Sequence, residues 1–510
     1  SAITFPSALS ASKFPIPATD TFPVEIDQAS PFNVEDRCQL FVDQVLVRET
    51  HNVCFNLHPG EKHPQNPLVR AVLPWEGWRL ELYGTVIFDQ QEKLFKMWYN
   101  GEAPDYFPDY AALYAVSKDG ISWEKPLVGT IPCLKPVRHN AVANACLLPN
   151  VIKDVHDPDP ARRYKMLCWI TNIENKFGYH SLTSHDGLHW KPLSTVPISP
   201  GGDVITGYYD EQRSLYVAFV KIMTEIRGHQ RRVFYVITSQ DFETWTQPEL
   251  ALVPDLRDDA GSLERIEEVR PLLDVPDSAR EMRTEFYGMG IYRHESCTLS
   301  FPWVFTINND GRFGNQEGPF ELQLGVSRDL VHWERPFRLP CVLRGRLDEW
   351  DCGLFVTPAQ ALRVGDEIWL YYGGSNYTHG TPCLYKSEGT GQGTKYTGSI
   401  GLVKWKLDRF VSVDAGSETG TLTTVPLIFS GTRLEINART KPGGEITVEI
   451  LDAAGRTIDA FGSSLRFEGD SLRHVIAWAH GQDVSRLRTQ PISLKFHIKN
   501  AELYSFAFRG

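Results

Sequence analysis

The sequence predicts an all-β protein: a five-bladed β-propeller followed by a C-terminal antiparallel β-sandwich. Three observations support this prediction. An S-x-D-x-x-x-W motif occurs four times, strand-rich units precede the motifs, and a different, alternating pattern follows them. Aromatic residues make up 12% of the 510-residue chain, and Gly (40) and Pro (33) interrupt it often. This composition is typical of β-proteins with many turns.

The chain divides into three parts. Residues 1–35 contain five prolines and show no sustained period, so we expect an extended N-terminal arm. Residues 36–414 carry the repeated units and are the predicted propeller. Residues 421–510 lack the repeat and alternate apolar with polar residues between short turns, which favours the β-sandwich.

The repeated motif is interpreted as structural. Its copies begin at Ser117, Ser184, Ser239 and Ser327. In two copies Asp-Gly stands between short strand-like runs, which is a hairpin signal. We expect each motif tryptophan to pack between neighbouring sheets. The fifth unit lacks the motif and closes with a strand over residues 398–405.

Composition narrows the functional classes. The net charge of −11 and the absence of a basic run argue against a nucleic-acid partner. No apolar run approaches the ~18–20 residues that span a bilayer, so no membrane partner is expected. Nine cysteines show no C-x-x-C pair, which favours buried free thiols. We expect no metal and no cofactor.

Candidate functional residues are found by their position at the start of the inner strand of each unit. Inner strands of a propeller line one channel, so residues at their starts converge on a funnel. Carboxylates stand there in four units: Glu81, Asp203, Glu285 and Asp351. Side chains nearby that could hold a substrate are Trp78, His139, Asn140, Arg270, Trp350 and His379. Grouped carboxylates are costly to bury, and glycoside cleavage needs one protonated and one ionised.

The five-unit pattern with its S-x-D-x-x-x-W turns and following β-sandwich resembles the propeller glycosidases of glycoside hydrolase families 32 and 43. The resemblance is closest to a divergent bacterial family 32-like group. It rests on residues 63–67, 83–85, 95–99 and 371–374, and on residues 443–452 and 500–506 of the predicted sandwich. The acidic motifs of family 32 are not present as such, so the residue roles below come from position in the units.

The resemblance implies an exo-acting glycoside hydrolase with a carbohydrate partner. We expect Glu81 and Asp203 as base or nucleophile, Glu285 as general acid, and Asp351 to orient the sugar or stabilise positive charge. A non-catalytic sugar-binding propeller is the alternative. A phosphorylase is a third reading, which Arg270, Arg283 and Arg344 keep open. The sugar, its linkage and the oligomeric state are left open, and export is slightly favoured.

Overall fold

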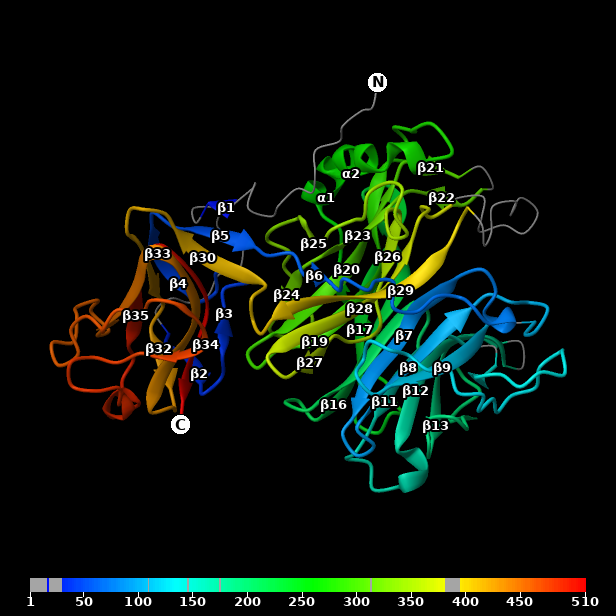
Figure 1. The fold of residues 1–510 in the computed structure, drawn as a ribbon, viewed down its shortest axis with the longest axis horizontal. Coiled ribbons are helices and arrows are strands. Elements are labelled where there is room, and N and C mark those ends of the chain that lie inside the picture. Colours follow the sequence, from blue (N-terminus) through cyan, green and yellow to red (C-terminus); the bar gives the residue numbers. More distant parts are fainter. Residues whose placement is uncertain are drawn as a thin grey trace.

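The computed structural model describes residues 16–17, 30–108, 110–144, 146–173, 176–311, 314–380 and 395–510. Five sheets of four or five strands form the larger body, and contacts join the inner strand of each sheet to the next around a ring. The structure therefore confirms the predicted five-bladed propeller (Figure 1). A second, nine-stranded sheet lies beside it.

Each blade is an antiparallel sheet whose first strand is innermost. Blade one contains β7 (Leu80–Asp89), β8 (Leu94–Gly101), β9 (Ala111–Ser117) and β10 (Ala141–Ala143). Blade two contains β11 (Cys146–Lys153), β12 (Tyr164–Ile173), β13 (Lys176–Ser184) and β14 (Lys191–Pro192). Blade three contains β15 (Ile205–Asp210), β16 (Leu215–Ile226), β17 (His229–Ser239) and β18 (Glu249–Leu252).

Blade four contains β19 (Arg283–Arg293), β20 (Thr298–Ile307), β23 (Phe320–Gln323), β24 (Gly325–Ser327) and β25 (Pro340–Val342). All ten residues of β20 are buried because blades cover both of its faces. This explains the unbroken apolar run over residues 301–305 in the middle of the strand. Outside the blade, β21 (Asn309–Asp310) pairs with β22 (Gln316–Glu317).

Blade five closes the ring with a strand from the beginning of the chain. It contains β26 (Leu354–Val356), β27 (Leu362–Val364), β28 (Glu367–Ser375), β29 (Gly398–Lys406) and, at its outer edge, β6 (Glu61–Lys62). Lys62 Nζ lies 2.6 Å from a carboxylate oxygen of Asp351, whose side chain is only 2% exposed. This ion pair joins the edge strand to the interior of the blade.

Lys62→Met is expected to lower the free energy of unfolding by about 3 kcal/mol, because it leaves a buried carboxylate without its counter-ion. Lys404→Met is the matched control, since Lys404 forms a more exposed pair with Glu367. The control should cost about 1 kcal/mol or less. Denaturant unfolding of both variants measures the difference. Equal losses would show that the Lys62 pair does not hold the blade closed.

The S-x-D-x-x-x-W motif builds a turn, as predicted. In the first copy, Asp119 Oδ1 accepts the backbone N–H groups of Ile121 and Ser122 at 2.8 and 2.7 Å. The ring of Trp123 lies 5.7 Å from that of Tyr371, which belongs to blade five. The tryptophan of this copy therefore packs against the neighbouring sheet, and the motif takes no part in the site described below.

The second sheet combines both ends of the chain. Its C-terminal strands are β30 (Val411–Ala415), β31 (Gly420–Thr424), β33 (Arg433–Leu451), β34 (Asp470–Val475) and β35 (Ser493–Arg509). Its N-terminal strands are β1 (Ile16–Pro17), β3 (Gln39–Leu40), β4 (Val47–His51) and β5 (Cys54–Leu57). Figure 1 shows the blue N-terminal strands among the orange and red ones. In addition, β2 (Phe32–Glu35) pairs with β32 (Leu427–Phe429).

This pairing moves one expected boundary. Residues 36–57 were assigned to the propeller, but β3, β4 and β5 pair with β35, β31 and β30. The partners are hundreds of residues away along the chain, so local pattern gives no sign of them. The remainder of the predicted arm, apart from β1 and the residues from 30 onward, lies outside the described residues. Closure of the second sheet into a sandwich stays a prediction.

Helices are few and short in the described part of the chain. The two α-helices are α1 (Leu256–Ala260) and α2 (Ser262–Glu268), both in the insertion before β19. Short 3-10 turns are η2 (Pro74–Glu76), η3 (Pro160–Arg162), η4 (Arg270–Leu272) and η6 (Ser485–Leu487). Among these elements no helix has the length and apolar character needed to cross a membrane.

Candidate active site

Three of the predicted carboxylates meet at one mouth of the propeller channel. Glu81 lies at the start of β7, Asp203 just before β15, and Glu285 near the start of β19. These are the same ends of three inner strands, so their side chains converge. Four cations accompany them: Arg79, Lys221, Arg232 and Arg283. We call these seven residues the acid cluster.

Glu81 has the properties of a proton donor. Its carboxylate pairs with Arg79 at 3.0 Å. Burial nevertheless raises the pKa of Glu81, and the negative charges of Glu102 and Asp203 raise it further. Arg79 is shared, because its Nε donates to Glu102 at 2.9 Å. Glu81 is therefore a carboxyl group that binds its proton more tightly than an ordinary glutamate.

Asp203 is the most accessible carboxylate of the cluster, with 33% of its side chain exposed. It forms an ion pair with Lys221 and accepts a hydrogen bond from the Tyr287 hydroxyl at 3.3 Å. Both contacts fix the orientation of its carboxylate. Its φ of 54° is in the left-handed region, which few non-glycine residues adopt and which is frequent at functional sites.

Glu285 is fully buried and held by two guanidinium groups. Arg232 Nη1 lies 2.5 Å from one oxygen and Arg283 Nε lies 2.8 Å from the other. The backbone N–H of Arg232 also donates to the carboxylate at 3.2 Å. The two guanidinium groups thus occupy both oxygens of the carboxylate, and neither oxygen is left for a substrate. The geometry therefore disfavours the general-acid role expected for Glu285 and makes it an anchor for Arg232.

Lys221 and His379 complete the polar surroundings of Asp203. Burial lowers the pKa of Lys221 to about 8, although Asp203 opposes the shift. Its ammonium group lies 3.7 Å from the centre of the Tyr287 ring. Burial first, then the charge of Arg232, lowers the pKa of His379 to about 3. His379 is thus a neutral imidazole, placed 5.2 Å from the Tyr287 ring.

Aromatic side chains border the acid cluster. The ring of Trp78 lies 4.9 Å from the Arg79 guanidinium and 5.7 Å from the ring of Tyr377. The Tyr377 hydroxyl accepts a hydrogen bond from Arg79 at 2.8 Å. Tyr110 also belongs here, since Glu81 helps to raise its pKa to about 12 after burial, the larger cause. Flat rings beside carboxylates are suited to the faces of sugar rings.

Asp351 and Trp350 occupy a different place from the one expected. Asp351 bonds to Lys62 at the outer edge of blade five and accepts from the Tyr372 hydroxyl at 2.7 Å. Trp350 stacks on the same Tyr372 ring, with centroids 5.5 Å apart. The residues lie near the start of β26, as predicted, but their partners come from β6 and β28 rather than from the acid cluster. We interpret both as structural.

His139 and Asn140 were placed at the start of an inner strand, but they precede β10, the outermost strand of blade one. The chain crosses to the next blade only after Ala143, and the inner strand β11 begins at Cys146. Asn140 is buried and accepts from Trp75 Nε1 at 2.8 Å. Neither residue has a contact with the acid cluster among those of the described chain.

Arg270 also lies apart from the cluster. It stands on η4 and pairs with Glu267 and Asp277, each at 2.6 Å. Of the phosphorylase candidates, Arg283 belongs to the acid cluster, whereas Arg344 lies 3.8 Å from Glu268. The ion pairs with Glu267 and Asp277 therefore balance the charge of Arg270, and no substrate is needed to explain its position.

Sequence reasoning missed the residues that give the acid cluster its chemistry. They are Arg79, Glu102, Lys221, Arg232 and Tyr287. Lys221 and Arg232 lie inside the long strands β16 and β17, away from the strand starts that were searched. A charged residue within an apolar strand run was the available signal. Only the folded chain shows the partners, which are Asp203 of blade three for Lys221 and Glu285 of blade four for Arg232.

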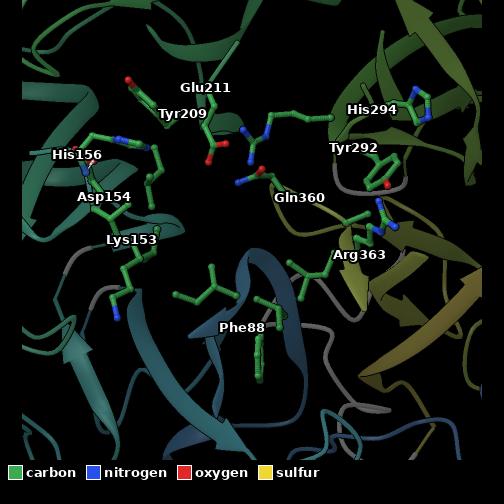
Figure 2. A pocket seen from close by; sticks show the side chains of 18 of the residues that line it. Phe88, Lys153, Asp154, His156, Tyr209, Glu211, Tyr292, His294, Gln360 and Arg363 are labelled. Carbon is green, nitrogen blue, oxygen red and sulfur yellow. Dashed lines mark hydrogen bonds between the residues drawn. The ribbon is translucent and has the colours of Figure 1, made fainter. Parts of the chain in front are cut away.

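The opposite mouth of the channel contains a cavity of about 380 Å³. It is lined by the far ends of the inner strands, and Figure 2 shows Lys153, His156, Tyr209, Glu211 and Gln360 around it. The rings of His156 and Tyr209 stack 5.0 Å apart on one wall. The acid cluster stands at the starts of these strands, so the cavity and the cluster lie at opposite ends of the channel.

Comparisons with known proteins give fold-level likenesses only. No protein-family model matches the chain, and no curated protein matches it either. Among solved structures, an N-acetylgalactosamine deacetylase from F. plautii in complex with blood group B trisaccharide is 13% identical, with a TM-score of 0.41. The match covers 70% of this chain and 96% of that one.

Two further solved structures are a β-1,2-mannobiose phosphorylase from Listeria innocua and a glycosyl hydrolase from Bacteroides ovatus. The first is 12% identical with a TM-score of 0.42, covering 71% of this chain and 98% of the other. The second is 11% identical with a TM-score of 0.40, covering 69% and 94%. Likeness at this level does not reach the chemistry of the site, so the function below is argued from the acid cluster.

Proposed function

We propose that the protein is a glycoside hydrolase that cleaves a terminal sugar from an oligo- or polysaccharide at the acid cluster. One observation carries the proposal: Glu81 and Asp203 lie close enough for the charge of Asp203 to raise the pKa of Glu81, while Asp203 pairs with Lys221 and is the more exposed of the two. Glycoside cleavage requires such a pair.

The carboxyl groups of Glu81 and Asp203 have different roles. Protonated Glu81 donates its proton to the leaving-group oxygen as the glycosidic bond breaks. Asp203, paired with Lys221, acts on the other side of the sugar ring, either as base on a water or as nucleophile. The anomeric configuration of the released sugar, read by NMR, distinguishes inversion from retention.

Phosphorolysis is the second candidate, and a specific observation supports it. Lys221 and Arg232 lie on the same side of the cluster, and the charge of Arg232 helps to lower the pKa of Lys221. Neighbouring cations of this kind are the groups that bind phosphate. In this structure Lys221 is already paired with Asp203 and Arg232 with Glu285. We therefore prefer hydrolysis to phosphorolysis.

A panel of aryl glycosides and oligosaccharides, with and without inorganic phosphate, tests both candidates. Sugar release independent of phosphate supports hydrolysis. Formation of a sugar phosphate that requires added phosphate moves the assignment to a phosphorylase. Binding of oligosaccharides without any cleavage over the whole panel would contradict both and leave a sugar-binding propeller.

Glu102→Gln is expected to move the alkaline limb of kcat/KM to lower pH. A general acid works while protonated, so the rate falls as pH rises through the pKa of Glu81. The Glu102 charge raises that pKa, and removing it lowers the pKa. The variant should keep its maximal rate within about 10-fold. An alkaline limb that stays in place would show that Glu81 is not the titrating acid.

A further inference from the structure

A second cluster of reactive side chains lies far from the acid cluster, at the junction of the propeller with the second sheet. It consists of Cys38, His294 and Asp408. Cys38 directly precedes β3, His294 directly follows β19, and Asp408 lies between β29 and β30. All three residues are buried, with exposed fractions of 5%, 5% and 7%. Three segments that are remote in sequence thus place a thiol, an imidazole and a carboxylate together.

The geometry is that of a set of ligands. One potential ligand atom from each residue lies within 4.8 Å of the other two. Cys38 Sγ is 3.3 Å from Asp408 Oδ2, and His294 Nε2 is 3.3 Å from Asp408 Oδ1. Ligand atoms around a tetrahedral Zn²⁺ at bond lengths of about 2.0–2.3 Å are about 3.3–3.5 Å apart. The observed separations agree with this spacing.

One atom in the cluster lacks the hydrogen bond that its burial demands. Asp408 Oδ1 accepts no well-aligned hydrogen bond from any part of the described chain, although His294 Nε2 is near. An unpaired buried carboxylate oxygen is costly. Oδ1 and Nε2 lie 3.3 Å apart, which is close enough for both atoms to contact one ion.

We propose that Cys38, His294 and Asp408 bind one divalent transition-metal ion of the Zn²⁺ type. Thiolate, imidazole and carboxylate together are a donor set suited to Zn²⁺ and unsuited to Mg²⁺ or Ca²⁺. The two anionic ligands balance the charge of the ion. When the ion binds, the thiol proton leaves to solvent and an Sγ–metal bond replaces the S–H bond.

The surroundings fit this chemistry. His294 Nδ1 accepts a hydrogen bond from the backbone N–H of Ser296 at 3.3 Å and lies 3.2 Å from Ser296 Oγ, and these contacts orient the ring with Nε2 toward Asp408. The three side chains leave a fourth position of a tetrahedral ion, which would fall to water.

A route for the ion is present. His294 and Asp408 line the cavity at the second mouth of the channel, where Figure 2 shows His294 at the edge. Cys38 and Asp408 also line a smaller cavity of about 60 Å³. A bound ion would cross-link the N-terminal segment, blade four and the crossover into the second sheet. Sequence spacing gave no sign of it, and no metal was expected there.

To test the proposal, metal is first removed from the untagged protein with a chelator. The protein is then titrated with Co²⁺ and Zn²⁺. We expect elemental mass spectrometry to find one ion bound per chain after dialysis. The absorption spectrum of the Co²⁺ form should show a thiolate-to-cobalt charge-transfer band. Excess Zn²⁺ should raise the midpoint of thermal unfolding above its value in chelator. Wild-type protein that binds no stoichiometric ion, or binds Co²⁺ without that band, would overturn the proposal.

Variants assign the ligands. Cys38→Ser should lose the band and weaken binding by more than about 10-fold. Asp408→Asn should keep the band and weaken binding by a similar factor. Asparagine tolerates the left-handed conformation of this position, where φ is 63°, so this variant serves even if Cys38→Ser fails to fold. Cys133→Ser changes a half-buried thiol elsewhere and should bind like the wild type. Undiminished binding by both ligand variants would contradict the assignment.

Discussion

Glu81→Gln is expected to lower kcat and kcat/KM by about 10²- to 10⁴-fold, the range typical of a lost general acid. Glutamine keeps the shape of the side chain and can still bond to Arg79, so folding should be little affected. What is lost is the proton, whose retention depends on burial and on the charges of Glu102 and Asp203. Steady-state kinetics on the best substrate of the panel measures the effect.

The leaving group gives a sharper readout than the rate alone. A substrate whose leaving group needs no protonation, such as a dinitrophenyl glycoside, should lose far less activity in Glu81→Gln than an oligosaccharide does. Glu418→Gln, at an exposed position remote from the site, should leave both rates unchanged. Equal loss on the two substrates would mean that Glu81 does not donate the proton.

Asp203→Asn is expected to lower kcat by a similar 10²- to 10⁴-fold, for both kinds of substrate. The reason is the loss of the carboxylate that pairs with Lys221 and has 33% of its side chain exposed. Asparagine is the appropriate replacement, because with alanine the left-handed backbone at φ 54° would itself be strained. Kinetics beside a thermal unfolding curve separates a chemical effect from a folding effect.

If Asp203→Asn is inactive because it lacks the carboxylate of the base or nucleophile, added formate, a small carboxylate, should restore part of its activity. Asp366→Asn, an exposed position at the edge of blade five, is the matched control and should remain fully active. Activity near wild type in Asp203→Asn would remove Asp203 from the mechanism and leave Glu81 without a partner.

The propeller could be predicted because its information is local. Each S-x-D-x-x-x-W turn closes its own hydrogen bonds, as Asp119 does with Ser122, so the motif marks blades regardless of context. The closing strand β6 could not be found this way. It has only two residues, Glu61 and Lys62, and becomes a strand by pairing with β29. The same holds for β3, β4 and β5, whose partners are at the other end of the chain.

The candidate site was half predictable for a related reason. Glu81, Asp203 and Glu285 follow from the rule that inner strands converge. The rule cannot say which carboxyl binds its proton more tightly, because the pKa of Glu81 depends on its burial and on the charges of Arg79, Glu102 and Asp203 around it. Asp351 satisfied the same rule, yet its side chain pairs with Lys62 of the edge strand. Position along a strand gives the place of a residue but not the partner that decides its chemistry.

The central claim is that Glu81 and Asp203 form a working acid and base pair for glycoside cleavage. The most direct measurement is the pH dependence of kcat/KM for sugar release by wild type, Glu81→Gln and Asp203→Asn. We expect a bell-shaped profile for the wild type, loss of the alkaline limb in Glu81→Gln and loss of the acid limb in Asp203→Asn. Sugar release with both limbs intact in either variant would contradict the account.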